Sequence, residues 1–157
     1  MLAPMATPQL PTLEQVNQMM RMTIPLVESC DIEVIELERG YARTRAPFEG
    51  NGNHFGVMYA GVLFTVAEVL GGVMAATTFD VTRFFPLVKT LEIDFKRPAR
   101  SDVTAEARLD KATIAAASAA AEADGKGPYE LRATVTDAEG TVVATTVGQY
   151  QIRPHAR

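Results

Sequence analysis

This sequence of 157 residues contains little cysteine and histidine, and it has no excess of positive charge. Its one cysteine, Cys30, excludes an internal disulfide framework and a site built from several thiolates. Because the two histidines, His54 and His155, are far apart in the chain, we expect no metal site and no cofactor. The formal net charge of -4 argues against a protein that coats nucleic acid or an anionic membrane, since both need clustered lysine and arginine.

Targeting and nucleotide-binding signals are also missing. Residues 1–11 contain three prolines and no positive charge, so they match neither a secretory signal nor a basic transit peptide. No glycine-rich phosphate loop occurs. We interpret residues 1–11 as a loose arm, 12–153 as one domain and 154–157 as a tail, and we expect a cytoplasmic protein.

A long hydrophobic run is present from Val57 to Phe79, and Glu68 is its only carboxylate. The run is long enough to raise the question of a membrane span. The acid at its centre, the pair Gly71-Gly72 and the lack of a flanking lysine and arginine cluster all argue against a span. We therefore predict a buried helix in a soluble protein.

The rest of the chain alternates between helical and strand periodicity. Thr12 is a candidate N-cap for an amphipathic helix that ends near Pro25, and Asp110 and Gly125 bracket a second, alanine-rich helix. Arg39-Gly40 is typical of a hairpin turn, and residues 47–55 read as a loop. Alternating apolar and polar residues predict strands at 32–37, 41–46, 87–96, 103–109, 129–136 and about 141–152.

An antiparallel sheet needs a cover for its apolar face, and only the helix within Val57–Phe79 is apolar enough on all sides. We predict an α+β fold in which the sheet wraps around this helix. One face of the helix then remains for a partner, because an exposed apolar patch of that size is unfavourable. The expected assembly is a homodimer, or a tetramer made of two dimers.

The central helix also carries a stripe of small residues around its acid. At about 100° per residue, Gly61, Thr65, Glu68 and Gly72 fall on one face. Small neighbours leave room beside the carboxylate for something other than protein.

Desolvation raises the pKa of a carboxylate in such surroundings, which makes Glu68 a candidate base or nucleophile. The alternative is structural: Glu68 pairs with Arg43 or Arg45, or caps the amides of a loop.

These residues resemble a known superfamily. The stretches NHFGVMYAGVLFTVAEVLGG and LEIDFKRPAR are similar to the hotdog acyl-CoA thioesterases of the phenylacetate and 4-hydroxybenzoyl-CoA type, and the resemblance runs from about Leu13 to Arg153. In that family a His-Gly-Gly tripeptide opens the central helix and an acid follows seven residues after the second glycine, as Glu68 follows Gly61. A glutamine or asparagine stands fifteen residues before the acid, where this chain has Asn53.

The resemblance implies a hotdog fold and a thioesterase mechanism. Glu68 attacks the thioester carbonyl or activates water, Asn53 orients water or substrate, and the amide of Ala60 or Gly61 holds the oxyanion. The chain departs from the pattern with Tyr59-Ala60 in place of His-Gly and with glycine one turn after the acid, where many members have serine or threonine. These departures resemble an uncharacterised branch of the superfamily.

Further residues are candidates for substrate binding. His54, Met58 and Tyr59 lie close to the start of the helix, and Thr65 is either a substitute for the missing hydroxyl or bonded to the preceding turn. Basic residues near Pro98 suit the phosphates of coenzyme A or form a solvated edge; they are Lys96, Arg97 and Arg100.

The sequence thus predicts a thioesterase that acts on a small-molecule acyl-CoA or on an acyl-carrier-protein thioester. The alternative is a non-catalytic binder of fatty-acyl or other apolar ligands in the same groove. A hotdog dehydratase ranks third, because the Asp and His pattern of those enzymes is absent from the sequence.

Overall fold

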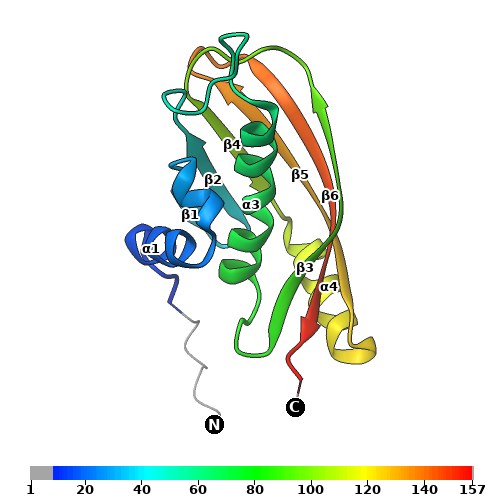
Figure 1. Ribbon diagram of the computed structural model, residues 1–157. Helices are drawn as coiled ribbons and strands as arrows, with labels where there is room; N and C mark the ends of the chain where they lie inside the picture. The colour runs from blue at the N-terminus through cyan, green and yellow to red at the C-terminus, as the bar shows by residue number, and fades with distance from the viewer. Residues whose placement is uncertain (1–8, 157) are drawn as a thin grey trace.

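A single antiparallel sheet curves around one long helix in the computed structural model, which describes residues 9–156 (Figure 1). The six strands follow the order β1-β2-β4-β5-β6-β3. This arrangement is the predicted α+β hotdog fold. The helices are α1 (Leu13–Thr23), α2 (Pro25–Ser29), α3 (Ala60–Thr78) and α4 (Lys111–Asp124), and the strands are β1 (Glu33–Glu38), β2 (Tyr41–Ala46), β3 (Phe84–Phe95), β4 (Val103–Arg108), β5 (Gly127–Asp137) and β6 (Val142–Pro154).

The predicted N-terminal helix is confirmed, and it ends near Pro25 as expected. Thr12 caps α1 through a capping box with Gln15, which satisfies two backbone N–H groups of the first turn. The helix stops at Thr23, and Pro25 opens the short helix α2, which the sequence did not predict. Proline suits the first position of a helix because a backbone N–H at that position would have no acceptor within the helix, so its absence costs nothing. Of the predicted arm, residues 1–8 lie outside the described residues.

Local turn and cap signals are confirmed at three places. Gly40 has a φ of 75° in the β1–β2 turn, and a Cβ there would lie 2.8 Å from the carbonyl oxygen of Leu109. Asp110 caps α4 by accepting from the backbone N–H of Thr113 at 2.7 Å. Gly125 ends the same helix with a φ of 71°. These residues define where the sheet turns and where α4 is inserted between β4 and β5.

The core lies between α3 and the concave face of the sheet. Thr44 of β2 connects the two layers, because its buried hydroxyl donates to the carbonyl oxygen of Val66 at 2.7 Å. Helix α3 is long and apolar enough to cross a membrane, but 67% of its apolar 18-residue stretch is buried inside the protein. It is therefore a core helix, as predicted for a soluble protein.

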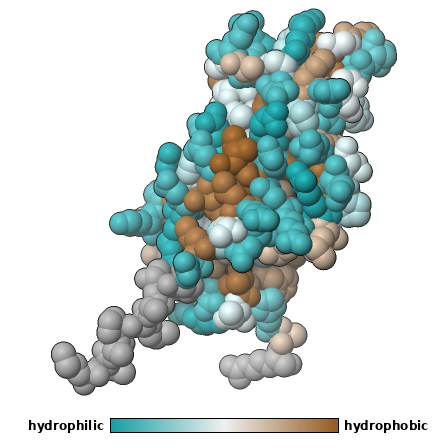
Figure 2. Space-filling view, turned by 90° about the vertical axis from the view of Figure 1, so that its left-hand side faces the viewer, coloured by the Kyte–Doolittle hydropathy of each residue, from teal (hydrophilic) through white to brown (hydrophobic). Residues whose placement is uncertain are grey.

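One side of α3 and the edge strand β3 stay open in the single chain. Phe64 on the helix and Leu87, Val88 and Phe95 on the strand are exposed large apolar residues. The strand predicted at 87–96 exists as β3, but most of its side chains are exposed in the single chain. Hydrophobic surface also gathers in the middle of the face on the α1 side of the molecule (Figure 2).

Candidate active site

Glu68 lies half-buried in α3, and its carboxylate has no charged partner among the described residues. None of the ion pairs within residues 9–156 includes it, and its carboxylate has no hydrogen-bonding partner among those residues. Burial raises the pKa of Glu68 above its ordinary value. A carboxyl group without a compensating cation and with a raised pKa is suited to accept a proton near neutral pH.

The alternative in which Arg43 or Arg45 pairs with Glu68 is wrong. Arg43 contacts Glu36 at 3.1 Å, and Arg45 contacts both Glu33 at 3.2 Å and Asp102 at 2.6 Å. The reason is the two-residue period of β2, which directs both arginines to the face opposite α3.

The N-terminus of α3 presents free backbone donors. Its N-cap, Tyr59, forms no side-chain cap. Because Ala60 and Gly61 occupy the first turn, their N–H groups have no acceptor within the helix. The aromatic ring of Tyr59 lies so close to Gly61 that a Cβ there would be 2.7 Å from it. Glycine therefore keeps this end of the helix compact, and the donors are available to a developing negative charge.

Asn53 organises the loop that precedes α3. Its Oδ1 accepts from the N–H of Phe55 at 2.9 Å and from that of Val57 at 3.4 Å. The backbone N–H of Asn53 donates to the carbonyl oxygen of Val57 at 2.8 Å. Within residues 9–156 its Nδ2 donates to no other group, so this amide is the part of Asn53 that can meet a ligand.

A hollow of about 290 Å³ lies beside this loop and the first turn of α3. It brings together five of the predicted site residues with an apolar lining, but Glu68 is not among them. The residues around it are Asn53, Val57, Met58, Ala60, Leu63, Phe95, Lys96, Arg97, Pro98 and Ala99.

Thr65 and His54 do not point to a shared site with Glu68: Thr65 is bonded within α3, and His54 lies on the exposed loop. The hydroxyl of Thr65 donates to the carbonyl oxygen of Gly61 at 2.7 Å, so the alternative bond to the preceding turn is the one observed. His54 is exposed and its ring lies 4.0 Å from that of Phe55. Their roles in substrate binding stay predictions.

The basic residues after β3 are exposed to solvent. Lys96 forms an ion pair with Asp94, whereas Arg97 and Arg100 form none among residues 9–156. Arg97 lines the hollow together with Lys96, and Arg100 does not. An exposed guanidinium without an acid partner is suited to bind phosphate oxygens.

The structure also reveals a residue that sequence reasoning missed. Tyr150 of β6 reaches α3, where its hydroxyl donates to the carbonyl oxygen of Glu68 at 3.4 Å. Burial is the main cause that raises the pKa of Tyr150, and the negative charge of Glu68 adds to it. The two glycines that make room for the ring, Gly71 and Gly148, are the only signal that the sequence offered.

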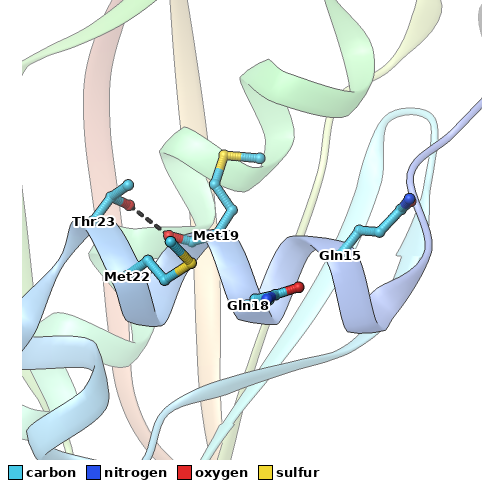
Figure 3. A pocket seen from close by; sticks show the side chains of 5 residues that line it. All are labelled: Gln15, Gln18, Met19, Met22 and Thr23. Carbon is cyan, nitrogen blue, oxygen red and sulfur yellow. Dashed lines mark hydrogen bonds between the residues drawn. The ribbon is translucent and has the colours of Figure 1, made fainter.

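A second hollow lies on the outer side of α1, away from these residues (Figure 3). It is lined by amides, thioethers and the hydroxyl of Thr23, which donates to the carbonyl oxygen of Met19 at 2.7 Å. This lining contains no acid and no base, so this hollow offers no group for acid–base chemistry.

Comparison with known proteins identifies the family. Residues 12–152 match the model of the family described as "Domain of unknown function (DUF4442)", and the chain belongs to it. A protein of known crystal structure from Pseudomonas aeruginosa, described as a protein of unknown function and probable thioesterase, is 40% identical in sequence with a TM-score of 0.88. The match covers 95% of this chain and 100% of that one.

Two more distant structures share the fold. A thioesterase from Haemophilus influenzae is 18% identical with a TM-score of 0.74, over 96% of each chain. A mutant thioesterase from Pseudomonas aeruginosa is 18% identical with a TM-score of 0.76, over 94% of this chain and 98% of that one. Comparison with curated proteins gives no match.

Proposed function

We propose that the protein is a thioesterase that hydrolyses an acyl-CoA or acyl-carrier-protein thioester. The observation that carries this proposal is the half-buried Glu68, which pairs with no group among residues 9–156 and has a raised pKa. By contrast, the pKa is lowered in the arginine-paired carboxylates Glu36, Asp102 and Glu130. The names of the related structures, which include thioesterases, support it. The particular branch of the hotdog thioesterases stays a prediction.

In the proposed reaction, Glu68 takes a proton from water as the water oxygen attacks the thioester carbonyl carbon. The N–H of Ala60 or Gly61 donates to the oxyanion that forms. Collapse of this intermediate breaks the C–S bond, and the thiolate leaves with the proton that Glu68 had taken. Direct attack by the carboxylate is the alternative first step, and water then releases the acyl group from it.

The distance along α3 supports a site shared between two chains. Ala60 and Glu68 are eight residues apart, which is about 12 Å along a helix at 1.5 Å per residue. A single carbonyl group cannot contact both within one chain. In the dimer that we propose, two α3 helices pack in opposite directions, so that Glu68 of one chain lies close to the first turn of the other. We propose a homodimer, which also covers the exposed Phe64 and β3 side chains.

The remaining roles combine the hollow beside the first turn with residues close to it in sequence. Within the hollow, Met58 borders the acyl group, Asn53 Nδ2 orients water, and Lys96 and Arg97 bind the phosphates of coenzyme A. Tyr59 and Arg100 lie outside the hollow, and we propose that they extend the acyl and phosphate contacts. Coenzyme A is part of the substrate, and we propose no separate cofactor and no nucleic-acid or membrane partner. A cytoplasmic location fits a substrate of this kind.

A second candidate function is a non-catalytic binder of apolar acyl groups. The observation that favours it is that Thr65 uses its hydroxyl within α3 and that Gly72 has no hydroxyl, so neither of these two positions offers a free hydroxyl to Glu68. A binder retains affinity for acyl-CoA without releasing thiol.

A thiol-release assay across short, long and aromatic acyl-CoAs tests the proposal. We expect cleavage of at least one of these substrates, and its loss in Glu68→Gln with acyl-CoA binding retained. Binding without cleavage by the unmodified protein supports the binder instead. Absence of both overturns the assignment.

A shared site has a separate test by complementation. Glu68→Gln and Ala60→Pro, each inactive alone, are mixed after unfolding and refolded together. Randomly mixed dimers should recover about a quarter of the wild-type activity, because half are mixed and each of those has one intact site. If no activity returns although mixed dimers form, the shared site is wrong.

A further inference from the structure

Tyr150 fills a slot between the sheet and the turn of α3 that carries Glu68. A Cβ added to Gly71 would lie 2.1 Å from the Tyr150 ring, and one added to Gly148 would lie 2.3 Å from it. Real side chains do not approach this closely, so both glycines are needed for the ring to lie where it does. The hydroxyl at the end of that ring donates to the carbonyl oxygen of Glu68 at 3.4 Å.

The neighbouring Tyr129 provides an internal comparison. It pairs with Tyr150 in the β5–β6 register, and the two rings stack at 5.6 Å with an angle of 15°. Both residues are 4% exposed. Their hydroxyls differ: that of Tyr150 reaches α3, whereas that of Tyr129 has no hydrogen-bonding partner within residues 9–156. Two rings in the same environment therefore have different connections to the site.

The turn of α3 that follows Glu68 has few side chains of its own to hold it. Two consecutive glycines, Gly71 and Gly72, follow Glu68 in α3, and glycine is the residue that restrains a helix least. The ring of Tyr150 sits against the first of them, and its hydroxyl holds the turn before it. The ring and the hydroxyl of Tyr150 therefore connect β6 to two neighbouring points of α3, one on each side of the position where the glycines begin.

We propose that Tyr150 is a positioning residue, which holds the Glu68 turn of α3 against the sheet and thereby sets the orientation and burial of the carboxylate. This inference rests on the proposed function for the importance of Glu68. Among the described residues, Tyr150 is the titratable group that faces Glu68, and Tyr129 is the one that faces Tyr150.

The experiment measures the Glu68 carboxyl group directly, by its ¹³C signal in protein labelled at the glutamate side chains. The Glu68→Gln protein identifies the signal by its disappearance. In Tyr150→Phe, which keeps the ring and removes the hydroxyl, we expect the pKa of Glu68 to fall toward its ordinary value by about half a unit or more, because the released turn gives the carboxylate more water. Tyr129→Phe is the matched control and should leave that pKa unchanged.

Kinetics provide the second readout. In Tyr150→Phe we expect kcat to fall by roughly 10- to 100-fold, with KM changed by less than about threefold, because the acid is misplaced while the binding groups remain. Tyr129→Phe should retain both constants.

An unchanged Glu68 pKa in folded Tyr150→Phe overturns the inference, and so does an equal change in Tyr129→Phe. If the unmodified protein cleaves no thioester but the pKa moves as expected, positioning stands and the thioesterase proposal fails.

Discussion

The carboxylates on the two sides of β2 differ in what surrounds them. On the outer face, Glu36 accepts from the hydroxyl of Tyr41 at 3.0 Å and from Arg43 at 3.1 Å, which together lower its pKa. Asp102 accepts from the N–H of Phe48 and from Arg45, and its pKa is lowered too. On the inner side, burial raises the pKa of Glu68, and no cation of residues 9–156 forms an ion pair with it.

This comparison shows that the choice of face, more than the number of arginines nearby in sequence, decides the chemistry of an acid. Arg43 and Arg45 flank Thr44, and only Thr44 faces α3. The cations therefore stabilise the sheet and leave Glu68 available. Five experiments test this difference, beginning with the largest expected effect.

Removing the charge of Glu68 should abolish turnover. Glu68→Gln is expected to lower kcat by roughly 100- to 10,000-fold, the usual contribution of a general base. Glu36→Gln, on the outer face, is the matched control and should retain activity. Thiol release under saturating substrate measures both, and equal losses in the two variants would show that the faces do not differ.

Removing the backbone donor of Ala60 should have the next largest effect. Ala60→Pro deletes the N–H at a helix position that accepts proline, and the extended backbone of Tyr59, with ψ of 135°, suits a residue before proline. We expect kcat to fall by roughly 100- to 1,000-fold with the fold intact by circular dichroism. Ala60→Gly keeps the N–H and should remain active. A loss below about tenfold in Ala60→Pro assigns the oxyanion contact to Gly61 instead.

Adding a side chain at Gly71, where the Tyr150 ring packs against α3, should lower the stability of the folded protein. The added methyl group of Gly71→Ala collides with the ring, and overpacking of this kind costs about 1–3 kcal/mol. Urea unfolding of the single variant, of Tyr150→Leu and of the double variant measures the coupling between them. If the two effects are additive, the slot does not exist in solution.

The pH dependence of stability should have opposite signs on the two faces. Since the folded-state pKa of Glu68 is raised above 4.5, the native state binds the proton more tightly than the unfolded chain does. The unfavourable contribution of the charge is absent below pH 4.5 and grows as the pH rises through the folded-state value. Glu68→Gln should therefore raise Tm at neutral pH and raise it less at pH 4, as thermal melts at several pH values will show. A gain independent of pH contradicts this sign.

The outer ion pairs should have the smallest effect. Arg45→Ala is expected to cost less than about 1 kcal/mol at neutral pH, because partly exposed pairs contribute little. As the pKa of Asp102 is lowered, its contribution is present above its ordinary value and disappears as the pH falls through the folded-state value. The cost of Arg45→Ala should shrink in acid, and chemical unfolding at neutral and acid pH checks this. A larger cost at low pH would mean that Arg45 acts through packing.

Much of the fold was predictable because its signals are local. Thr12, Asp110 and Gly125 act on N–H and carbonyl groups within one or two turns, so their roles depend on few neighbours. Proline at 25 was predicted to end a helix, and it does so while opening α2, since proline is unfavourable inside a helix and favourable at its start. The period of β2 in principle also indicated that Arg43 and Arg45 share a face, but not which face meets α3.

The candidate site also has features that were predictable from one segment and features that depend on tertiary contacts. The position of Glu68 within an apolar helix and the small residues around it are properties of one segment, and the sequence by itself determined them. Tyr150 lies 82 residues away in the chain, and only the pairing of β6 within the sheet brings its hydroxyl to the Glu68 turn. Only the tertiary structure decided that Glu36 and Asp102 meet arginines whereas Glu68 does not, because these pairings depend on contacts between different strands and loops that no local period contains.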